Sequence, residues 1–255
     1  MAAFPLMLPG TSRPPKLVVF DLDHTLIACD ATILWTEFLY EKKIVTDPIW
    51  RQYDRDMVKS YAKGVLDIRD FCRKHAGAFR SIPEEKLHAL AQEFAKKKIA
   101  PLIFPDGKKW VKNALQANIQ ACVLSASAAF IVKPIAKLFG LTDAMGIELA
   151  FKDGFCTGEI VGIPTFQEGK VERLSQRLAE AGIGFEDVLF FTDSRNDLPL
   201  AERAGYTVCV NPDAVLESAA RKNGWKVAEW KLSLRTQMTA QVDAKGVPET
   251  QTVRS

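Results

Sequence analysis

The sequence predicts an α/β fold in which a doubly wound parallel sheet is interrupted, after its first strand, by a helical insertion. Short apolar runs at residues 17–20, 119–124, 188–191 and 206–210 are typical of strands that are buried on both faces. Helical patterns separate the last three runs, and strands that alternate with helices form parallel sheets. Residues 30–100 instead carry helical periodicity with no strand pattern.

The insertion is expected to form a small helical bundle. Apolar residues at helical spacing predict its helices over residues 33–39, 50–65, 68–75 and 81–95. Gly64 is suited to end the second of these helices, because glycine adopts the left-handed conformation at low cost. Ser81 has the position of an N-cap, since Pro83 and two glutamates would follow it in the first turn.

The rest of the chain supplies the other elements of a Rossmann-like core. Helices are expected over residues 130–139, 171–181, 198–204 and 214–223. Residues 145–163 alternate in polarity and contain glycine turns, which indicates a hairpin. The predicted organisation is a loose arm over 1–15, a core over 16–29 and 101–231, a helical domain over 30–100 and a polar tail over 232–255.

Composition excludes several classes of protein. A content of 47% hydrophobic and 25% charged residues is ordinary for a globular protein, and a net charge of +3 is too small to favour a nucleic-acid partner. The five cysteines are scattered without metal-ligand spacing, which favours a reduced, cytoplasmic protein. No apolar run reaches the roughly 20 residues of a membrane helix, so no membrane partner is expected. Both a monomer and a dimer fit these observations.

Two acids follow the first predicted strand. Asp21 ends the strand, where open α/β sheets bind ligands, and Asp23 projects to the same side two residues later. Two carboxylates this close repel each other unless a cation binds or one of them takes a proton. Mg²⁺ prefers such oxygen ligands, and a protonated Asp23 could serve as a general acid. An Asx-type turn would account for the same residues without chemistry.

Other strand ends carry further candidates. Ser125 and Asp193 end the second and third apolar runs, with Asp197 one helical turn later, and Lys170 begins a helix between them. Taken singly, Ser125 could be a buried turn, Lys170 a surface charge, and the two acids an N-cap and a surface acid. The small neighbour Ala126 would let an anion approach the backbone N–H groups. Because parallel strands end at one edge, these residues are expected to converge.

The segment Asp21-Leu-Asp-His-Thr-Leu resembles motif one of the haloacid dehalogenase superfamily, Asp-x-Asp-x-Thr-Leu. Ser125, Lys170 and the pair Asp193-x3-Asp197 follow in the order of that family's other motifs. The resemblance implies that Asp21 is a nucleophile that becomes phosphorylated and that Asp23 is the acid/base. It also implies phosphate or substrate contacts from Lys170, Ser125, Ala126, Thr25 and Asn196. The implied cofactor is Mg²⁺, held by Asp21, Asp193 and the backbone carbonyl of Asp23, with support from Asp197.

The helical insertion lies where one branch of this superfamily, which includes phosphoserine phosphatase, carries a helical cap. The phosphoserine phosphatases that this chain resembles have Ser-Gly-Gly at motif two and Gly-Asp-Gly-x-x-Asn-Asp at motif four. This chain has Ser-Ala-Ser from Ser125 and Thr-Asp-Ser-Arg-Asn-Asp from Thr192 at the same places. A sibling group with an Asp-Ser-x-Asn-Asp motif includes histidinol-phosphate phosphatases. The acid Asp30 has the offset at which the phosphoserine enzymes contact the substrate amine, and Arg73 lies roughly where they bind its carboxylate. An N-cap at Asp30 and a solvated Arg73 are the alternatives.

The expected function is Mg²⁺-dependent hydrolysis of a small phosphomonoester, an amino alcohol phosphate such as histidinol phosphate or phosphoserine. A phosphotransferase or mutase with the same aspartyl intermediate, and a non-catalytic phosphate-binding module, are the rival hypotheses. Receiver domains also phosphorylate an Asp at a strand end, but they lack such a cap. The sequence contains no Gly-x4-Gly-Lys-Ser/Thr loop, Gly-x-Ser-x-Gly elbow or His-Glu-x-x-His pair, so P-loop, esterase and zincin chemistry have no support.

Overall fold

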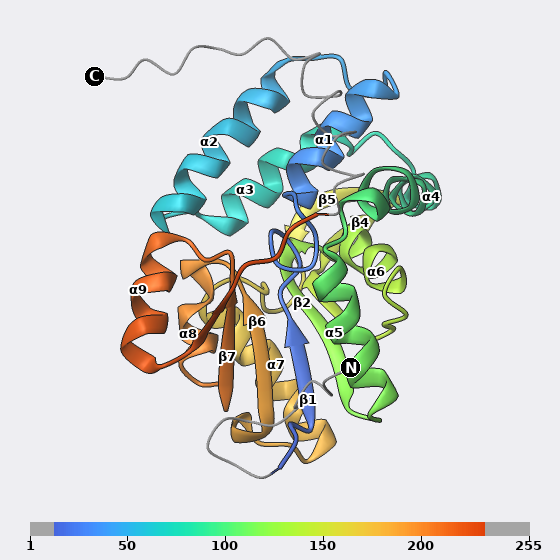
Figure 1. Cartoon of the computed structure of the whole chain (residues 1–255). Coiled ribbons are helices and arrows are strands. Elements are labelled where there is room, and N and C mark those ends of the chain that lie inside the picture. The colour runs from blue at the N-terminus through green and yellow to red at the C-terminus, as the bar shows by residue number, and fades with distance from the viewer. Residues whose placement is uncertain (1–12, 233–255) are drawn as a thin grey trace, which may run out of the picture.

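The computed structural model describes residues 13–232 (Figure 1). The predicted arm over 1–15 and tail over 232–255 lie almost entirely outside the described residues. Six parallel strands form the central sheet in the order β3-β2-β1-β6-β7-β8. Their bounds are β1 Leu17–Phe20, β2 Gln120–Ala128, β3 Ala144–Ile147, β6 Val188–Thr192, β7 Tyr206–Val210 and β8 Lys226–Ala228. No helix of the described chain is long and apolar enough to cross a membrane.

Helices cover both faces of this sheet, so the prediction of a doubly wound α/β fold is confirmed. Val18 and Phe20 of β1 join the apolar cluster that contains α5 (Pro105–Gln116) and α6 (Ala129–Lys137), whereas Leu17 and Val19 join the cluster of the opposite face. The helices on that second face are α7 Glu168–Ala181, α8 Leu198–Ala201 and α9 Ala214–Asn223. Since each fully buried apolar side chain contributes about 1.5–3 kcal/mol, burial on both faces makes β1 the centre of the core.

Four helices lie above the carboxyl edge of the sheet, and Figure 1 shows them as a separate layer there. They are α1 Ala31–Glu41, α2 Ile49–Lys63, α3 Ile68–His75 and α4 Glu84–Phe94. Below, these four helices are called the cap; the boundaries predicted for it, 30–100, stay a prediction. Gly64 ends α2 in the left-handed conformation with φ 72°. The N-cap predicted at Ser81 is wrong, because α4 begins at Glu84 after Pro83 and no side chain caps it.

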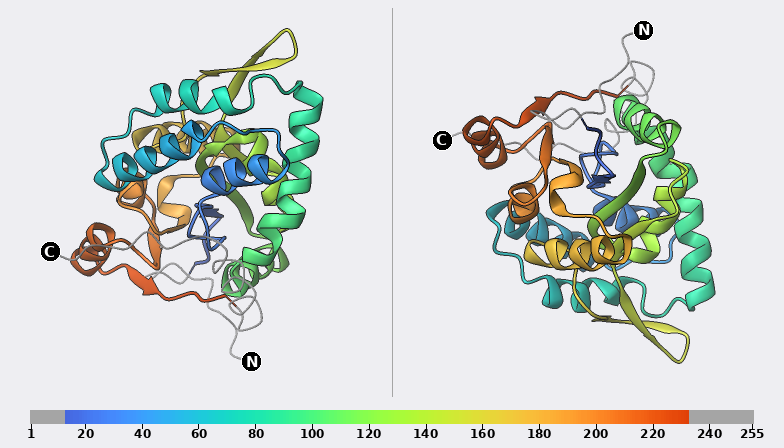
Figure 2. Two further views of the ribbon diagram at one scale, coloured as in Figure 1. Left: turned by 90° about the horizontal axis from the view of Figure 1, so that it is seen from above. Right: turned by 90° about the horizontal axis from the view of Figure 1, so that it is seen from below.

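The hairpin predicted over 145–163 is shorter than expected. Residues Ala144–Ile147 form β3, which pairs with β2 in the central sheet. The hairpin consists of β4 (Leu149–Lys152) and β5 (Phe155–Ile160), and it projects from the body of the molecule (Figure 2). Alternation of polarity indicates an extended chain but does not identify its partner strand, so the two pairings look alike in the sequence. The elements α5 and β8 were not predicted.

Candidate active site

Strand register brings the predicted residues to one edge of the sheet. Phe20 of β1 pairs with Val123 of β2 and with Phe191 of β6. Asp21 therefore lies level with Leu124 and Thr192, one residue before Ser125 on β2 and before Asp193, which follows β6. The aromatic rings of Phe20 and Phe191 stack beneath this edge, with centroids 4.8 Å apart.

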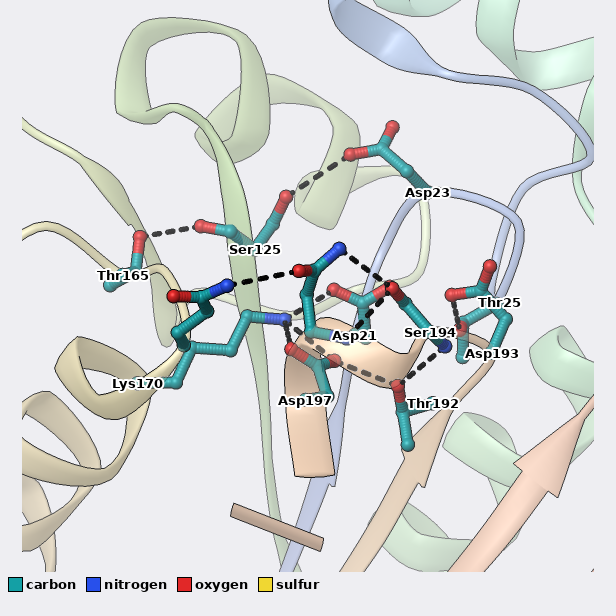
Figure 3. Close-up of polar contacts among 12 residues, drawn as sticks. Asp21, Asp23, Thr25, Ser125, Thr165, Lys170, Thr192, Asp193, Ser194 and Asp197 are labelled. Carbon is teal, nitrogen blue, oxygen red and sulfur yellow. Dashed lines mark hydrogen bonds and ion pairs between the residues drawn. The ribbon is translucent and has the colours of Figure 1, made fainter. Parts of the chain in front are cut away.

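Lys170 lies at the centre of this group (Figure 3). Its ammonium group donates to Oδ1 of Asp21 at 2.8 Å and to Oδ2 of Asp197 at 2.8 Å, and only 1% of the residue is exposed. Thr192 donates a second hydrogen bond, of 2.7 Å, to Oδ2 of Asp197. Burial alone would lower the pKa of Lys170, but attraction to Asp197 and Asp21 outweighs it, so the pKa lies above its usual value and Lys170 is a cation.

The backbone before Lys170 explains the glycine beside it. A Cβ atom at Gly169 would lie 1.9 Å from the carbonyl oxygen of Pro164, so only glycine fits the start of α7. The loop that leads into α7 is tied to β2, because Thr165 donates to the backbone carbonyl of Ser125. Gln167, in the same segment, has the left-handed backbone angle φ 48°. This closely packed loop places the first turn of α7, which contains Lys170, beside the carboxyl ends of the strands.

The carboxyl group of Asp21 is buried among other acids. Burial raises its pKa to about 7; Lys170 lowers the pKa, and Asp197 and Asp23 raise it. Burial also raises the pKa of Asp193 well above its usual value, with Asp21 and Asp197 adding repulsion. Thr25 donates a 3.2 Å hydrogen bond to Oδ1 of Asp193. The single positive charge of Lys170 therefore faces several carboxyl groups, and the site has an excess of negative charge.

The carboxyl group of Asp23 forms hydrogen bonds with different residues from those that contact Asp21. Its Oδ1 accepts a 2.6 Å hydrogen bond from the backbone N–H of Ala31, and its Oδ2 accepts from the hydroxyls of Ser127 at 2.8 Å and Ser125 at 3.3 Å. Burial, and then repulsion from Asp30, raise the pKa of Asp23 to about 6. Ser127 was not among the predicted residues. Its spacing of two from Ser125 on a strand could have indicated that both side chains point the same way.

A cavity of about 50 Å³ separates this edge from the cap. It is lined by Asp23, His24, Asp30, Thr32, Met57, Tyr61, Leu66, Ile68, Phe71, Ala126, Ser127 and Asp193. Asp30 lines the cavity and caps α1 by accepting from the backbone N–H of Ile33 at 3.0 Å, so the N-cap is observed and its contact with a substrate amine stays a prediction. Arg73 is not brought to the cavity: its side chain is 53% exposed and forms an ion pair of 3.5 Å with Glu159.

Asn196 contacts the cap rather than the cavity. Its side-chain nitrogen donates to the backbone carbonyl of Tyr61 at 3.0 Å, and its oxygen accepts from Gln167 at 3.1 Å. Gln167 also donates to the carbonyl of Gly64 at 3.3 Å, at the end of α2. Gln167 was not predicted as a site residue, and no sequence pattern marks it. Together these two amides connect the sheet edge to the C-terminus of α2.

The donor groups fit the predicted magnesium ion. Among residues 13–232, no three His, Cys, Asp or Glu side chains form a complete metal site. The predicted set needs only two side chains, Asp21 and Asp193, with the backbone carbonyl of Asp23. Burial, with repulsion from Asp197 and Asp23, raises the pKa of Asp21, and burial, with repulsion from Asp21 and Asp197, raises that of Asp193. A hard divalent cation with oxygen ligands would offset this repulsion.

Residues 18–202 match the haloacid dehalogenase-like hydrolase family, and the chain belongs to that family. A histidinol-phosphatase of Neisseria meningitidis serogroup C is 36% identical over 220 residues, which cover 85% of this chain and 99% of that protein. A crystal structure of a Bordetella pertussis protein of unknown function is 32% identical with a TM-score of 0.76, over 84% of this chain and 97% of that one. A phospho-aspartyl intermediate analogue of phosphoserine phosphatase shares the fold, with a TM-score of 0.64 at 21% identity, over 89% of this chain and 99% of that one.

Proposed function

We propose that this chain is a Mg²⁺-dependent phosphomonoester phosphatase that forms an aspartyl phosphate on Asp21. The observation that carries the proposal is the pair of carboxyl groups at the end of β1. Asp21 is paired with the buried cation Lys170, and Asp23, with a pKa of about 6, is held by hydrogen bonds two residues away. A nucleophile and a separate acid/base group are what a two-step phosphoryl transfer requires.

In the first step an oxygen of Asp21 attacks phosphorus, the bond from phosphorus to the ester oxygen breaks, and Asp23 gives its proton to that oxygen. In the second step Asp23 takes a proton from the water that attacks the phosphoaspartate, which restores Asp21 and releases inorganic phosphate. A pKa of about 6 leaves both forms of Asp23 populated near neutral pH, as these two roles require. Lys170 and Ser125 would hold the transferred group. When bound, Mg²⁺ supplies neutralisation of the phosphoryl charge.

The cavity supports a substrate that carries a positive charge but no carboxylate. Asp30 faces it, and the cap side contributes apolar and aromatic walls from Tyr61, Ile68 and Phe71. Among the described residues, no Lys or Arg lines it, so the carboxylate of phosphoserine would lack a partner there. An imidazole ring with an amine, as in histidinol phosphate, suits these walls better. The similarity to a histidinol-phosphatase agrees with this choice.

The cavity volume implies that the cap moves during turnover. A cavity of about 50 Å³ has room for only a few water molecules, each of which needs about 10–15 Å³ by this measure, so we infer that the cap helices separate from the sheet edge to admit an amino alcohol phosphate. The contacts of Asn196 and Gln167 with α2 would break in that movement.

The proposal is tested by assaying a panel of phosphomonoesters with Mg²⁺, including L-histidinol phosphate, phosphoserine and 4-nitrophenyl phosphate. Release of inorganic phosphate is expected, fastest with histidinol phosphate. Transfer of the phosphoryl group to an added alcohol without release of phosphate would instead identify a phosphotransferase. Binding of phosphate with no turnover of any ester would identify a non-catalytic module.

A further inference from the structure

One carboxylate oxygen of Asp23 is held by the first turn of the cap, and the other is held by β2, through Ser127 and a longer 3.3 Å bond from Ser125. Oδ1 accepts a 2.6 Å hydrogen bond from the N–H of Ala31, the first residue of α1. Oδ2 accepts a 2.8 Å hydrogen bond from the hydroxyl of Ser127 on β2. The hydroxyl oxygen of Ser127 in turn lies 3.1 Å from that of Thr32, the next residue of α1. The orientation of the Asp23 carboxyl group therefore depends on how α1 meets the end of β2.

The hydroxyl hydrogens of Ser127 and Thr32 determine which group donates in each of these hydrogen bonds. A serine hydroxyl has one hydrogen and can also accept. When Ser127 donates to the ionised Asp23, its oxygen accepts from the hydroxyl of Thr32. Ser127 is only 5% exposed, so water does not readily replace either partner. A chain of two hydroxyl groups thus links α1 to one oxygen of Asp23. A glycine at position 127, as in the Ser-Gly-Gly pattern, could form neither bond.

We propose, on the basis of the phosphatase function proposed above, that Ser127 is a positioning residue for Asp23. Its hydroxyl group fixes the orientation of the Asp23 carboxyl group, which donates the proton to the leaving oxygen. Thr32 extends this control to the cap, because the hydroxyl chain is complete only when α1 is docked on β2. Proton donation by Asp23 is thereby coupled to closure of the cap. Ser127 contributes to protonation of the leaving group and not to attack by Asp21.

The test compares leaving groups in single-turnover experiments, which isolate the first step. L-histidinol phosphate has an alkoxide leaving group that must be protonated, whereas the nitrophenolate of 4-nitrophenyl phosphate departs without a proton. Ser127→Ala is expected to slow release of the alcohol from histidinol phosphate by about 10- to 100-fold, part of the usual contribution of a general acid. It should slow nitrophenol release less than about 3-fold. Thr32→Val should give a smaller loss with the same selectivity, and Ser127→Thr should restore most of the rate.

Ser218→Ala, an exposed serine on α9, is the matched control and should change neither rate. Equal slowing of both substrates by Ser127→Ala would overturn the proposal, because general damage to the site does not distinguish leaving groups. An unchanged rate with histidinol phosphate would overturn it as well. Failure of the proposed function has a different signature, since the wild-type protein would then release product from neither substrate.

Discussion

The ammonium group of Lys170 lies 2.8 Å from Oδ1 of Asp21 and 2.7 Å from Oδ1 of Asp197, and none of the three residues is more than 6% exposed. Each carboxyl group is desolvated by the fold and relies on the same cation. Breaking a buried ion pair leaves uncompensated charge in a medium of low dielectric constant. Lys170 is therefore expected to matter for stability as well as for holding the phosphoryl group.

Lys170→Met should lower the free energy of unfolding by about 3–5 kcal/mol at pH 8, measured by urea denaturation. The loss should shrink as the pH falls, because without Lys170 the pKa of Asp21 lies above its wild-type value of about 7 and the carboxyl group takes a proton, which removes the uncompensated charge. The control is Lys133→Met, which removes a cation from an exposed pair with Glu148 at 2.8 Å. Such exposed pairs contribute about 1 kcal/mol or less. Equal losses in the two variants would contradict the account of Lys170.

A second buried acid, Asp54, lies within the cap. Burial raises its pKa to about 7, and its Oδ1 has no hydrogen-bond partner. The nearby His75, 3.6 Å from that oxygen, has its pKa lowered to about 4 by burial, so it is neutral there and gives no compensating charge. Since the pKa of Asp54 is about 7 in the folded state and 3.8 ordinarily, the folded state binds more protons than the unfolded state between about pH 4 and pH 7. Asp54 therefore costs stability progressively as the pH rises from about 4 to 7.

Asp54→Asn should remove this cost, because the amide does not titrate. The free energy of unfolding of the variant minus that of the wild-type protein should increase with pH between about 4 and 7 and stay level above that range. Urea denaturation at several pH values measures the difference, with the exposed Asp56→Asn as control. A difference that does not change with pH would show that Asp54 ionises normally.

The proposed magnesium site predicts stabilisation by the metal without any substrate. Mg²⁺ that binds only the folded state should raise the melting temperature of the wild-type protein as its concentration increases. EDTA should abolish phosphatase activity, and added Mg²⁺ should restore it. Asp193→Asn removes a proposed ligand and should abolish the thermal shift. If this variant keeps the full shift, the metal binds elsewhere.

Asp30 is predicted to recognise a positive charge on the substrate, but it also caps α1. Asp30→Ser keeps a side-chain acceptor at the N-cap while removing the negative charge. Loss of a charge-assisted hydrogen bond should cost about 1.5–3 kcal/mol in kcat/KM for histidinol phosphate and little for 4-nitrophenyl phosphate. The same loss for both esters, or none for either, would mean that Asp30 serves α1 alone.

The convergence of Asp21, Lys170 and Asp193 could be predicted because it depends only on topology: parallel strands end at one edge whatever lies between them. The bounds of β7 and α9 agree with those predicted from periodicity and turn residues. By contrast, β3 and β8 are short, at four and three residues, and so carry little periodic signal.

Contacts between side chains were harder to predict than the positions of residues on helices and strands. Arg73 lies on α3 as expected, but the orientation of its side chain toward Glu159 depends on how α3 packs against β5. Ser127 and Gln167 have polar side chains that resemble many others in the sequence. Their contacts with Asp23 and Asn196 join residues that lie far apart in the sequence and form only when the strands and loops of the core have come together.

The proposed nucleophile is tested most directly by trapping the phosphorylated enzyme. Wild-type protein is mixed with Mg²⁺ and an excess of phosphorus-labelled histidinol phosphate, quenched in acid within the first turnovers and analysed by peptide mass spectrometry. The phosphoryl group should be found on Asp21, and Asp21→Asn should carry no label and lose several orders of magnitude in turnover while remaining folded. Label on another residue, or an Asp21→Asn variant with more than about a tenth of the wild-type rate, would contradict the account.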